Sequence, residues 1–374
     1  MTAEFLVDTG ASDVLGRAEP GLFGPVSPRL GVSVVVPARD EARRLPALVA
    51  ALARQRDLSG RPFRRGTVEV LVLLNNCTDR SAWALARSAA RDGLRVRATR
   101  VTLPDGEAHV GRARQILMDA ACARLHAAGR PDGVVCSTDA DTAPAPDWVA
   151  QTLAEVGQGV DAVGGRALLL PAERAALAPG VRRLYLLDLA YRRAVEALRG
   201  LYAPESWDPL PRHHHHFGAS LAVTARAYAA VGGLPDARTS EDVALVHALW
   251  RAGLRLRHSP HVRVYTSARA TGRADGGLAD AFQFWDDAAR SGVEPRVEAA
   301  ADAERRLAAL GLDRRARPDT PPPLGLMATP DAPPGGGEPI TVAVGGLRDR
   351  IARLRPLSLD ARLDRARRLL RHDR

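Results

Sequence analysis

The sequence predicts an α/β protein in which helices cover both faces of a mostly parallel central sheet. Three observations support this prediction. Short apolar runs rich in β-branched residues alternate with segments of helical period between residues 31 and 138. Hydrophobic residues make up 46% of the chain and charged residues 26%, which are the proportions of a folded globular protein. The length of 374 residues is enough for two packed units and a tail.

The first part of the chain alternates between these two patterns. Strands are expected where β-branched apolar residues run together, at 32–36, 68–74, 94–101 and 133–138. Helices are expected where apolar residues recur at helical spacing, near 41–55, 80–91 and 110–128. Strands joined by helices in this way run parallel, and ligands bind such sheets beyond the carboxyl ends of the strands. The turn after the first strand lacks the G-x-G-x-x-G pattern, which disfavours a nicotinamide dehydrogenase.

The second part of the chain is less regular. Strands are expected near 160–168, 217–223 and 262–266, and helices near 181–200, 241–252 and 278–290. A Pro/Gly-rich linker at about 317–338 precedes a last amphipathic segment at 359–372, which we expect to dock on the domain; contact with a membrane or a protein partner is the alternative. The predicted division is an N-terminal arm (1–30), two halves of a main domain (31–165 and 166–290) and a helical tail (291–374).

The charge pattern excludes several classes of protein. The 53 basic residues exceed the 43 acidic ones, which gives a net charge of +10, and every basic residue is arginine. Without lysine the chain cannot be a P-loop NTPase, a pyridoxal-phosphate enzyme or a protein kinase, because each of these needs a lysine in its site. Aromatic residues make up only 4% of the chain, so there is no base-stacking platform and we expect no nucleic-acid partner.

The three cysteines, Cys77, Cys122 and Cys136, are odd in number and far apart, which argues against a disulfide framework and a zinc site. Free thiols suit a reducing cytosol. The sequence shows neither a signal peptide nor an apolar stretch long enough to span a membrane. We therefore expect a cytoplasmic protein without a transmembrane segment.

Two aspartates stand where the fourth predicted strand ends. On an extended segment, Asp139 and Asp141 would present both carboxylates on the same side. Carboxylates together with phosphate oxygens are the usual ligands of Mg²⁺ or Mn²⁺ in proteins that bind a diphosphate. The alternative is a pair of turn acids before Ala143 and Pro144 that binds no ligand.

Five motifs, in the same order, resemble those of the family 2 glycosyltransferases of GT-A fold, over about residues 31–290. They are VSVVVPARDEARRL, LLNNCTDRSAWALA, VGRARQILMDAA, CSTDADTAPAPDWV and TSEDVALVHALWRAG. The resemblance implies that residues 31–165 bind a nucleotide-sugar, that 166–290 bind the acceptor, and that the two aspartates form a metal-binding D-x-D motif. The chain departs from the family at Leu74 or Asn75, where an acid usually holds the pyrimidine ring, and at Gln115, where asparagine is usual. The first departure leaves the base of the donor open.

The resemblance also implies roles for individual residues. Asp242 would be the general base that takes the proton from an acceptor hydroxyl, Glu241 would orient the acceptor or the base, and the transfer would invert the anomeric centre. From local chemistry alone, both acids could instead stabilise the first turn of a helix after Ser240. The residues implied in donor binding are Pro37, Arg39, Glu41, Asn75, Asn76, Asp79, Arg112, Arg114 and Asp139. For the two arginines of the third helix, a position facing solvent is the alternative.

A run of four histidines, His213–His216, comes just before a predicted strand. It could be a polar loop, part of an acceptor site or a transition-metal site. In an extended segment His214 and His216 would share one face, so these two are candidates for acceptor binding, together with Arg269. His261 is the candidate for a third metal ligand.

Together these observations predict an inverting, metal-dependent glycosyltransferase with Mg²⁺ or Mn²⁺ as cofactor. Its substrates would be a nucleotide-diphospho-sugar and an acceptor hydroxyl. A sugar-phosphate nucleotidyltransferase is the alternative among enzymes, although this chain has neither the Gly-rich opening loop nor the lysine of such enzymes. A catalytically inactive binding or scaffold protein of the same fold is the alternative outside enzymes.

Overall fold

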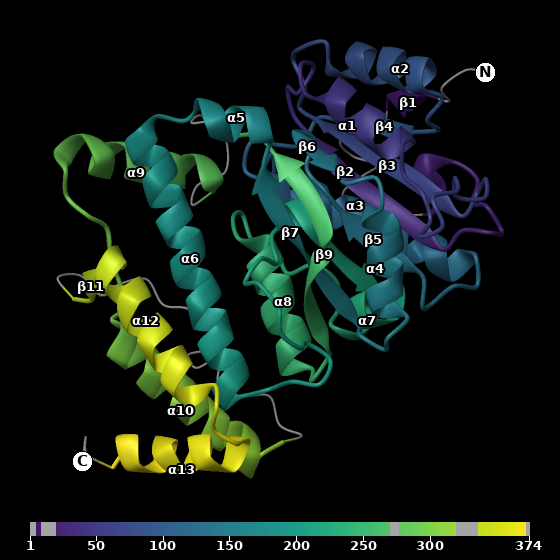
Figure 1. Cartoon of the computed structure of the whole chain (residues 1–374). Coiled ribbons are helices and arrows are strands. Elements are labelled where there is room, and N and C mark those ends of the chain that lie inside the picture. Colours follow the sequence, from purple (N-terminus) through teal and green to yellow (C-terminus); the bar gives the residue numbers. More distant parts are fainter. Residues whose placement is uncertain (1–4, 9–19, 270–276, 319–335, 372–374) are drawn as a thin grey trace. The chain divides into compact units, whose positions relative to one another are not determined.

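The computed structural model describes residues 5–8, 20–269, 277–318 and 336–371. The chain forms two compact units (Figure 1). Unit 1 comprises residues 1–170, 215–250 and 254–267, and unit 2 comprises residues 171–214, 251–253 and 268–374. The main sheet belongs to unit 1, whereas unit 2 is mostly helical.

Among the described residues, the nine strands of unit 1 form one sheet. In spatial order they are β1 (Phe5–Asp8), β4 (Arg97–Val101), β3 (Val68–Asn75), β2 (Val32–Ala38), β5 (Val134–Ser137), β8 (Leu221–Thr224), β7 (Ala162–Leu169), β9 (Leu256–Thr266) and β6 (Thr142–Pro144). The first five strands in this order are parallel to one another. β8 is antiparallel to both its neighbours, β7 and β9 are parallel, and β6 is antiparallel to β9. The mostly parallel sheet predicted from the sequence is confirmed.

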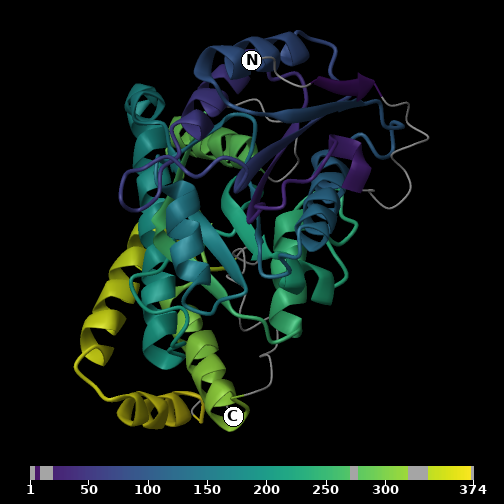
Figure 2. The ribbon, with the colours of Figure 1, turned by 90° about the vertical axis from the view of Figure 1, so that its right-hand side faces the viewer.

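Helices pack on both faces of this sheet. They are α1 (Leu45–Ala53), α2 (Ser81–Asp92), α3 (Val110–Ala127), α4 (Trp148–Val156), α7 (Ala225–Ala230) and α8 (Glu241–Arg251). Strand β2 is buried along its whole length, and its side chains alternate between the faces. Val35 lies in one buried cluster with Leu117 of α3, and its neighbours Val34 and Val36 are equally buried. Burial on both faces explains why β2 is mostly apolar. Figure 2 shows the purple and blue helices beside the strands.

Several element boundaries differ from the sequence prediction. Residues 5–8, within the predicted arm, form strand β1, which pairs with β4 through main-chain hydrogen bonds that require no side-chain pattern. The strand predicted at 217–223 begins only at Leu221, because Gly218–Ser220 forms a 3₁₀ turn. Strand β9 is longer than expected and begins at Leu256. Of the predicted linker, residues 319–335 lie outside the described residues.

Unit 2 is organised around a long helix, α6 (Pro179–Tyr202). Its other elements are α5 (Pro171–Ala176), α9 (Leu278–Ser291), α10 (Ala300–Ala316), α12 (Ile340–Leu354), α13 (Leu359–Leu369) and the short antiparallel strands β10 (Arg296–Val297) and β11 (Glu338–Pro339). Helix α6 packs against α9, α10 and α12 and buries Leu184, Val195 and Leu198. The buried side chains of this helix, which was predicted near residues 181–200, therefore form part of the core of unit 2.

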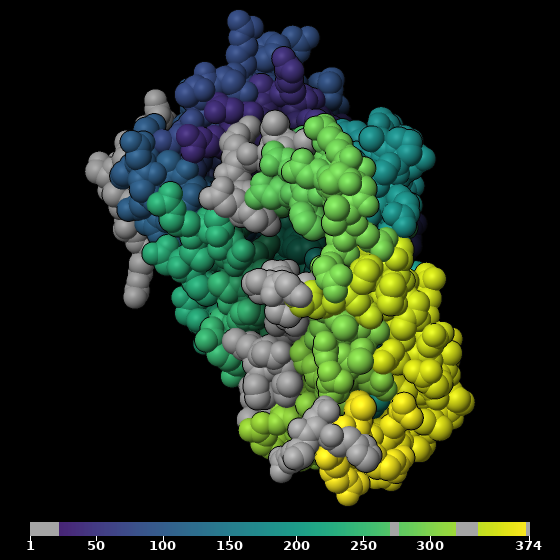
Figure 3. All heavy atoms as spheres, turned by 90° about the vertical axis from the view of Figure 1, so that its left-hand side faces the viewer, coloured from purple at the N-terminus to yellow at the C-terminus, as the bar shows by residue number. Residues whose placement is uncertain are grey.

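The C-terminal helices pack on the rest of unit 2, as Figure 3 shows for the yellow α12 and α13 against the green α10. Leu363 and Ala366 of α13 are buried, while Arg367 and Arg368 on the same helix are exposed. The docking expected for this amphipathic segment is thus present in the structure. Among the described residues, no helix combines the length and the apolar character that crossing a bilayer requires.

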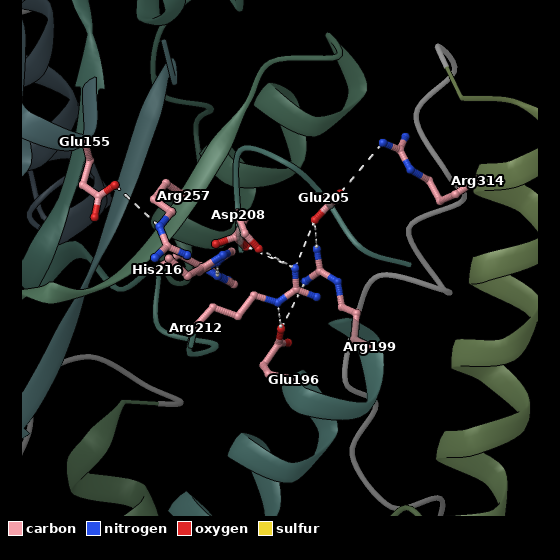
Figure 4. A network of polar contacts seen from close by, with 10 residues as sticks. Glu155, Glu196, Arg199, Glu205, Asp208, Arg212, His216, Arg257 and Arg314 are labelled. Carbon is pink, nitrogen blue, oxygen red and sulfur yellow. Dashed lines mark hydrogen bonds and ion pairs between the residues drawn. The ribbon is translucent and has the colours of Figure 1, made fainter. Parts of the chain in front are cut away.

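A buried ion-pair network joins α6 to the segment 203–214 that follows it (Figure 4). The side chain of Arg212 is 1% exposed, with its Nε 3.1 Å from Oε2 of Glu196 and its Nη1 3.4 Å from Oε2 of Glu205. Arg199 Nη2 lies 2.9 Å from the same oxygen of Glu205, and Asp208 Oδ2 lies 3.6 Å from Arg212. Arg314 adds a more distant contact, with its Nη2 3.9 Å from Oε1 of Glu205, so Arg199 and Arg212 are the two closely paired buried cations of these carboxylates.

We expect the substitution Arg212→Met to lower the free energy of unfolding by about 3–5 kcal/mol, because it removes a buried cation that lies within 3.6 Å of all three carboxylates. The control is Arg290→Met, since the ion pair of Arg290 with Asp286 is exposed and its loss should cost less than about 1 kcal/mol. Denaturant unfolding of both variants measures the difference. Equal losses in the two variants would show that the buried network does not stabilise unit 2.

Candidate active site

The loops that follow β2, β3 and β5 lie at one edge of the sheet in unit 1, because these strands are parallel and end in register. Ala38 of β2 pairs with Leu74 of β3, and Val35 of β2 pairs with Ser137 of β5. The predicted donor-binding and metal-binding residues of these three loops therefore lie at the carboxyl edge, where α/β proteins bind their ligands.

Carboxylates lock the loop after β2 to the loop after β3. Asp40 Oδ1 accepts hydrogen bonds from the main-chain N–H groups of Thr78 (2.7 Å) and Asp79 (3.1 Å). Asp79 in turn accepts from the main-chain N–H groups of Ala42 (3.0 Å) and Ser81 (2.8 Å). Asp40 has φ +48°, which is uncommon for a residue other than glycine. Asp79, a predicted donor contact, thus has a second role in fixing the shape of both loops.

The same loops contain three potential metal ligands, Asp40, Cys77 and Asp79, whose ligand atoms lie within 4.8 Å of one another. Both carboxylates accept the hydrogen bonds described above. Cys77 Sγ lies 3.4 Å from the main-chain oxygen of Ala38 and 3.4 Å from the main-chain nitrogen of Asp40. Burial raises the pKa of the Cys77 thiol, which disfavours the thiolate form that binds metals. Hydrogen bonding accounts for this cluster, and we assign no metal to it.

The two asparagines at the end of β3 differ in how the protein uses them. Asn76 donates from Nδ2 to the main-chain oxygen of Leu103 (2.9 Å), and its Oδ1 accepts from the main-chain nitrogen of the same residue (2.9 Å). Asn75 is 3% exposed, and its Oδ1 has no hydrogen-bond partner among the residues that the structure describes. A buried amide oxygen without a partner is costly, so Asn75 carries an acceptor that a ligand can satisfy.

The turn after β2 presents the exposed cation Arg39. Pro37 and Glu41 are buried, and the main-chain N–H of Glu41 donates to Ser81 Oγ (2.8 Å). Arg39 is exposed, and its Nη1 donates to the main-chain oxygen of Ala108 (2.8 Å). Pro37 and Glu41 thus form part of the wall of this edge, whereas the guanidinium of Arg39 lies at its surface.

Arg112 and Gln115 lie at the start of α3, which is capped by His109. The ring Nδ1 of His109 accepts from the main-chain nitrogen of Arg112 (3.2 Å), and burial lowers the pKa of this histidine, which favours the neutral form that can accept. Arg112 Nη1 donates to Oε1 of Gln115 (2.7 Å), and its Nε lies 3.2 Å from Oε2 of Glu107. Gln115 Nε2 donates to the main-chain oxygen of Leu234 (3.0 Å), so this departure from the family pattern has a structural use.

Asp139 and Asp141 lie in a tight turn, and the predicted extended conformation is not found. The main-chain nitrogen of Thr142 donates to the main-chain oxygen of Asp139 (3.1 Å), which reverses the chain before β6. Two carboxylates in one turn still supply the hard oxygen donors that Mg²⁺ and Mn²⁺ accept, so the residues fit such an ion. His261 is exposed on β9 and, within the described ranges, belongs to no group of three clustered potential ligands.

Arg114 of α3 joins three of the predicted motifs. Its side chain is 5% exposed, and its Nε donates to Ser137 Oγ (3.1 Å). Its Nη2 donates to Oδ1 of Asp139 (2.5 Å), and its Nη1 pairs with Oε1 of Glu241. Glu241 is the first residue of α8, and its side chain is 4% exposed. The D-x-D turn and the Glu-Asp step therefore meet at one arginine.

Asp242 is half-buried and held by two main-chain groups. Its Oδ2 accepts from the nitrogen of Gly218 (2.7 Å), and its Oδ1 accepts from the nitrogen of Val243 (2.8 Å). Ser240, just before α8, has φ +55°, a conformation that in a non-glycine residue is strained and is common at functional sites. Sequence reasoning missed Gly218 and Ser137, because their roles depend on main-chain atoms and on the pairing of β5 with β8, which no residue pattern signals.

The run His213–His216 lies outside the strands, and it is divided between the two units after its second residue. His215 is buried, and its Nδ1 accepts from the main-chain nitrogen of Ala167 in β7 (3.1 Å). His216 Nδ1 lies 3.4 Å from Nε2 of His258 in β9. The last two histidines therefore contact different strands, β7 and β9.

The comparison with known families agrees with this geometry. Residues 33–180 match the model of glycosyl transferase family 2. The matched segment contains the turn after β2, the loop after β3, Arg114 and the D-x-D turn, which are brought together at the carboxyl edge. Over residues 33–180 the chain is similar to glycosyl transferase family 2. The match ends before Glu241 and Asp242.

Three of the similar solved structures are the following. A mannosyltransferase from Pyrobaculum calidifontis, in complex with GDP-Man and Mn²⁺, is 18% identical over 95% of this chain and 91% of that chain, with a TM-score of 0.43. TarS 1–349 from S. aureus, in complex with UDP, is 12% identical over 76% and 72%, with a TM-score of 0.42. Glucosyl-3-phosphoglycerate synthase from M. tuberculosis is 18% identical over 70% and 81%, with a TM-score of 0.38. A comparison with curated proteins finds no match.

Proposed function

We propose that this protein is a cytoplasmic, inverting glycosyltransferase that moves a sugar from a nucleoside-diphosphate sugar to an acceptor hydroxyl. The observation that carries the proposal is the contact of Arg114 with both Asp139 and Glu241. This contact brings an acid of the D-x-D turn next to the helix start that carries Asp242. A group suited to a metal-bound diphosphate and a group suited to proton abstraction therefore share one site, which the chemistry of sugar transfer requires.

On the donor side, the proposed contacts lie at the carboxyl edge of the sheet. The buried Oδ1 of Asn75 would accept an N–H group of the donor base. Arg39 and Arg112 would donate to its phosphates, because guanidinium groups bind phosphate with several hydrogen bonds. The remaining predicted donor contacts shape the wall of the site through the main chain; they are Pro37, Glu41, Asn76 and Asp79.

Asp242 is the proposed general base. The bond from the anomeric carbon to the diphosphate breaks as a bond to the acceptor oxygen forms on the opposite face, and the hydroxyl proton passes to Asp242. Asp139 and Asp141 would hold Mg²⁺ or Mn²⁺, an ion that stabilises negative charge on a departing diphosphate. One displacement of this kind inverts the anomeric centre and needs no covalent intermediate on the enzyme.

On the acceptor side, the proposed contacts are His214, His216 and Arg269. His216 is half-buried and lies beside the rings of His258 and Trp250, with ring centroids 5.6 and 5.9 Å away. A hydrogen-bonding group beside an aromatic ring suits an acceptor that carries hydroxyl groups. The exposed arginines of α13 are the proposed contact for a protein partner or a membrane surface.

The test is donor hydrolysis with a panel of UDP-, GDP- and dTDP-sugars, each with Mg²⁺ or Mn²⁺. We expect slow release of the nucleoside diphosphate from at least one donor, because water replaces the missing acceptor, and loss of this release in the Asp141→Ala variant. Turnover of a nucleoside triphosphate with a sugar phosphate would instead identify a nucleotidyltransferase. Binding of none of these donors in calorimetry would favour an inactive scaffold and contradict the proposal.

A further inference from the structure

We propose that Arg114 is a positioning residue, which holds the carboxylates of Asp139 and Glu241 at a fixed separation and does not bind the donor phosphates. The role of Arg114 in the reaction rests on the proposed function. Its contacts with Asp139 and Glu241 are present in the structure whether or not that function holds. The guanidinium of Arg114 would then act on the reaction only through the carboxylates that it holds.

Protein groups surround the guanidinium of Arg114 on its edges and on one face. Each of its three nitrogens contacts a different side chain, those of Ser137, Asp139 and Glu241. The main chain of Gly218 lies against the guanidinium, because a Cβ added to this glycine would be 2.5 Å from Cζ of Arg114. Ser137 connects Arg114 with Gly218, since its Oγ accepts a hydrogen bond from Arg114 and donates one to the main-chain oxygen of Gly218 (2.9 Å). Little of the guanidinium is left for a phosphate.

The charges at this cluster also favour a positioning role. Arg114 provides one positive charge against the two negative charges of Asp139 and Glu241. Glu241 is almost completely buried, and a carboxylate in that position requires a cation and hydrogen bonds to offset the loss of water. Asp139 is 35% exposed and meets Arg114 through Oδ1, so its second oxygen can serve as a metal ligand. Arg114 therefore stabilises one buried acid and orients another.

Through these contacts Arg114 sets the distance between the two sides of the proposed reaction. Asp139 belongs to the turn that would bind the metal, while Glu241 is the chain neighbour of Asp242. Gly218, which packs on the guanidinium, also donates its N–H to Asp242. A displacement of about 1 Å between reacting groups lowers the rate of an enzyme about 100-fold. Loss of the guanidinium contacts of Arg114 with the two carboxylates should therefore slow the reaction even when the donor still binds.

The experiment compares Arg114→Lys and Arg114→Gln with the unaltered protein, using a donor that the hydrolysis panel has identified. We expect kcat to fall about 100-fold in both variants, because lysine keeps the charge but cannot contact three side chains at once. The Kd of the donor with Mn²⁺, measured by calorimetry, should stay within about threefold. The control is Arg91→Lys, because Arg91 is an exposed arginine that pairs with Asp92 on α2.

A rise of tenfold or more in the donor Kd of Arg114→Lys, with kcat unchanged at saturating donor, would overturn the proposal and make Arg114 a phosphate ligand. A milder variant, Glu241→Gln, removes the negative charge that pairs with Arg114 while keeping the shape of the side chain. This variant tests the proposal if the Arg114 variants do not fold. We expect Glu241→Gln to lower kcat with little change in donor Kd. An unchanged kcat in Glu241→Gln would also overturn the proposal.

A second measurement separates this proposal from the proposed function. The unfolding midpoints of Arg114→Gln, Glu241→Gln and the double variant do not depend on any donor. We expect the double variant to lose less stability than the sum of the two single variants, because the second substitution removes a contact that is already broken. Additive losses would show that the two side chains are not coupled. If no donor binds but the losses are non-additive, the proposed function fails while the arginine contact stands.

Discussion

Replacing Asp242 by asparagine is expected to lower kcat by about 100-fold or more while leaving the donor Kd almost unchanged, because the variant keeps the shape of the side chain but cannot take up a proton. Asparagine retains one oxygen, so it can still accept from Gly218 or from Val243. Steady-state kinetics at saturating donor, together with calorimetry of donor binding, would measure the two quantities separately.

The control for this variant is Asp92→Asn, which removes a carboxylate from the surface of α2. It should leave both kcat and donor Kd unaltered. If Asp242→Asn instead weakened donor binding as much as it lowered the rate, Asp242 would be a donor contact and the general base would have to be sought elsewhere. An unfolding curve of the variant guards against the trivial case of a damaged fold.

The second large effect is expected for Asp141→Asn. If the D-x-D turn holds the divalent ion, this variant should bind Mn²⁺ more weakly in the presence of nucleoside diphosphate and should lose about 100-fold or more in rate, since charge on the leaving diphosphate is no longer stabilised. Asp141 is chosen because a substitution of Asp139 would also remove its contact with Arg114. Calorimetric titration with Mn²⁺, with and without the nucleotide, measures the loss.

The matched control is Asp132→Asn, an exposed carboxylate that pairs with Arg226 away from the D-x-D turn. Its Mn²⁺ titration should resemble that of the unaltered protein. A variant at Asp141 that bound Mn²⁺ and nucleotide normally would exclude this residue as a metal ligand. Activity in the presence of a chelator would exclude the metal altogether.

The sequence predicted the α/β class and the carboxyl-edge site because those signals are local. Strand β2 is mostly apolar since both of its faces are buried, and the loops after β2, β3 and β5 follow from the parallel order. The tail helix α13 was predicted for a similar reason, because its leucines recur at helical spacing. These features depend on patterns within a few residues of one another.

The features that could not be predicted depend on contacts between distant residues. Nothing in the helix motif shows that Arg114 pairs with Glu241, because the pairing requires α3 and the start of α8 to meet at the end of β5. The D-x-D segment was expected to be extended, but a main-chain hydrogen bond to Asp139 closes a turn. The partners of His215 in β7 and of His216 in β9 could not be predicted either, because only the assembled sheet provides them.

The interlocked loops after β2 and β3 have a consequence for how the donor would bind. Asp40 and Asp79 fix these loops through main-chain hydrogen bonds that need no ligand. A rigid surface loses little conformational entropy when a ligand arrives, so more of the contact energy remains as affinity. This side of the site would act as a preorganised template, and selectivity among nucleotides would come from the fit of rigid groups rather than from ordering of the loops.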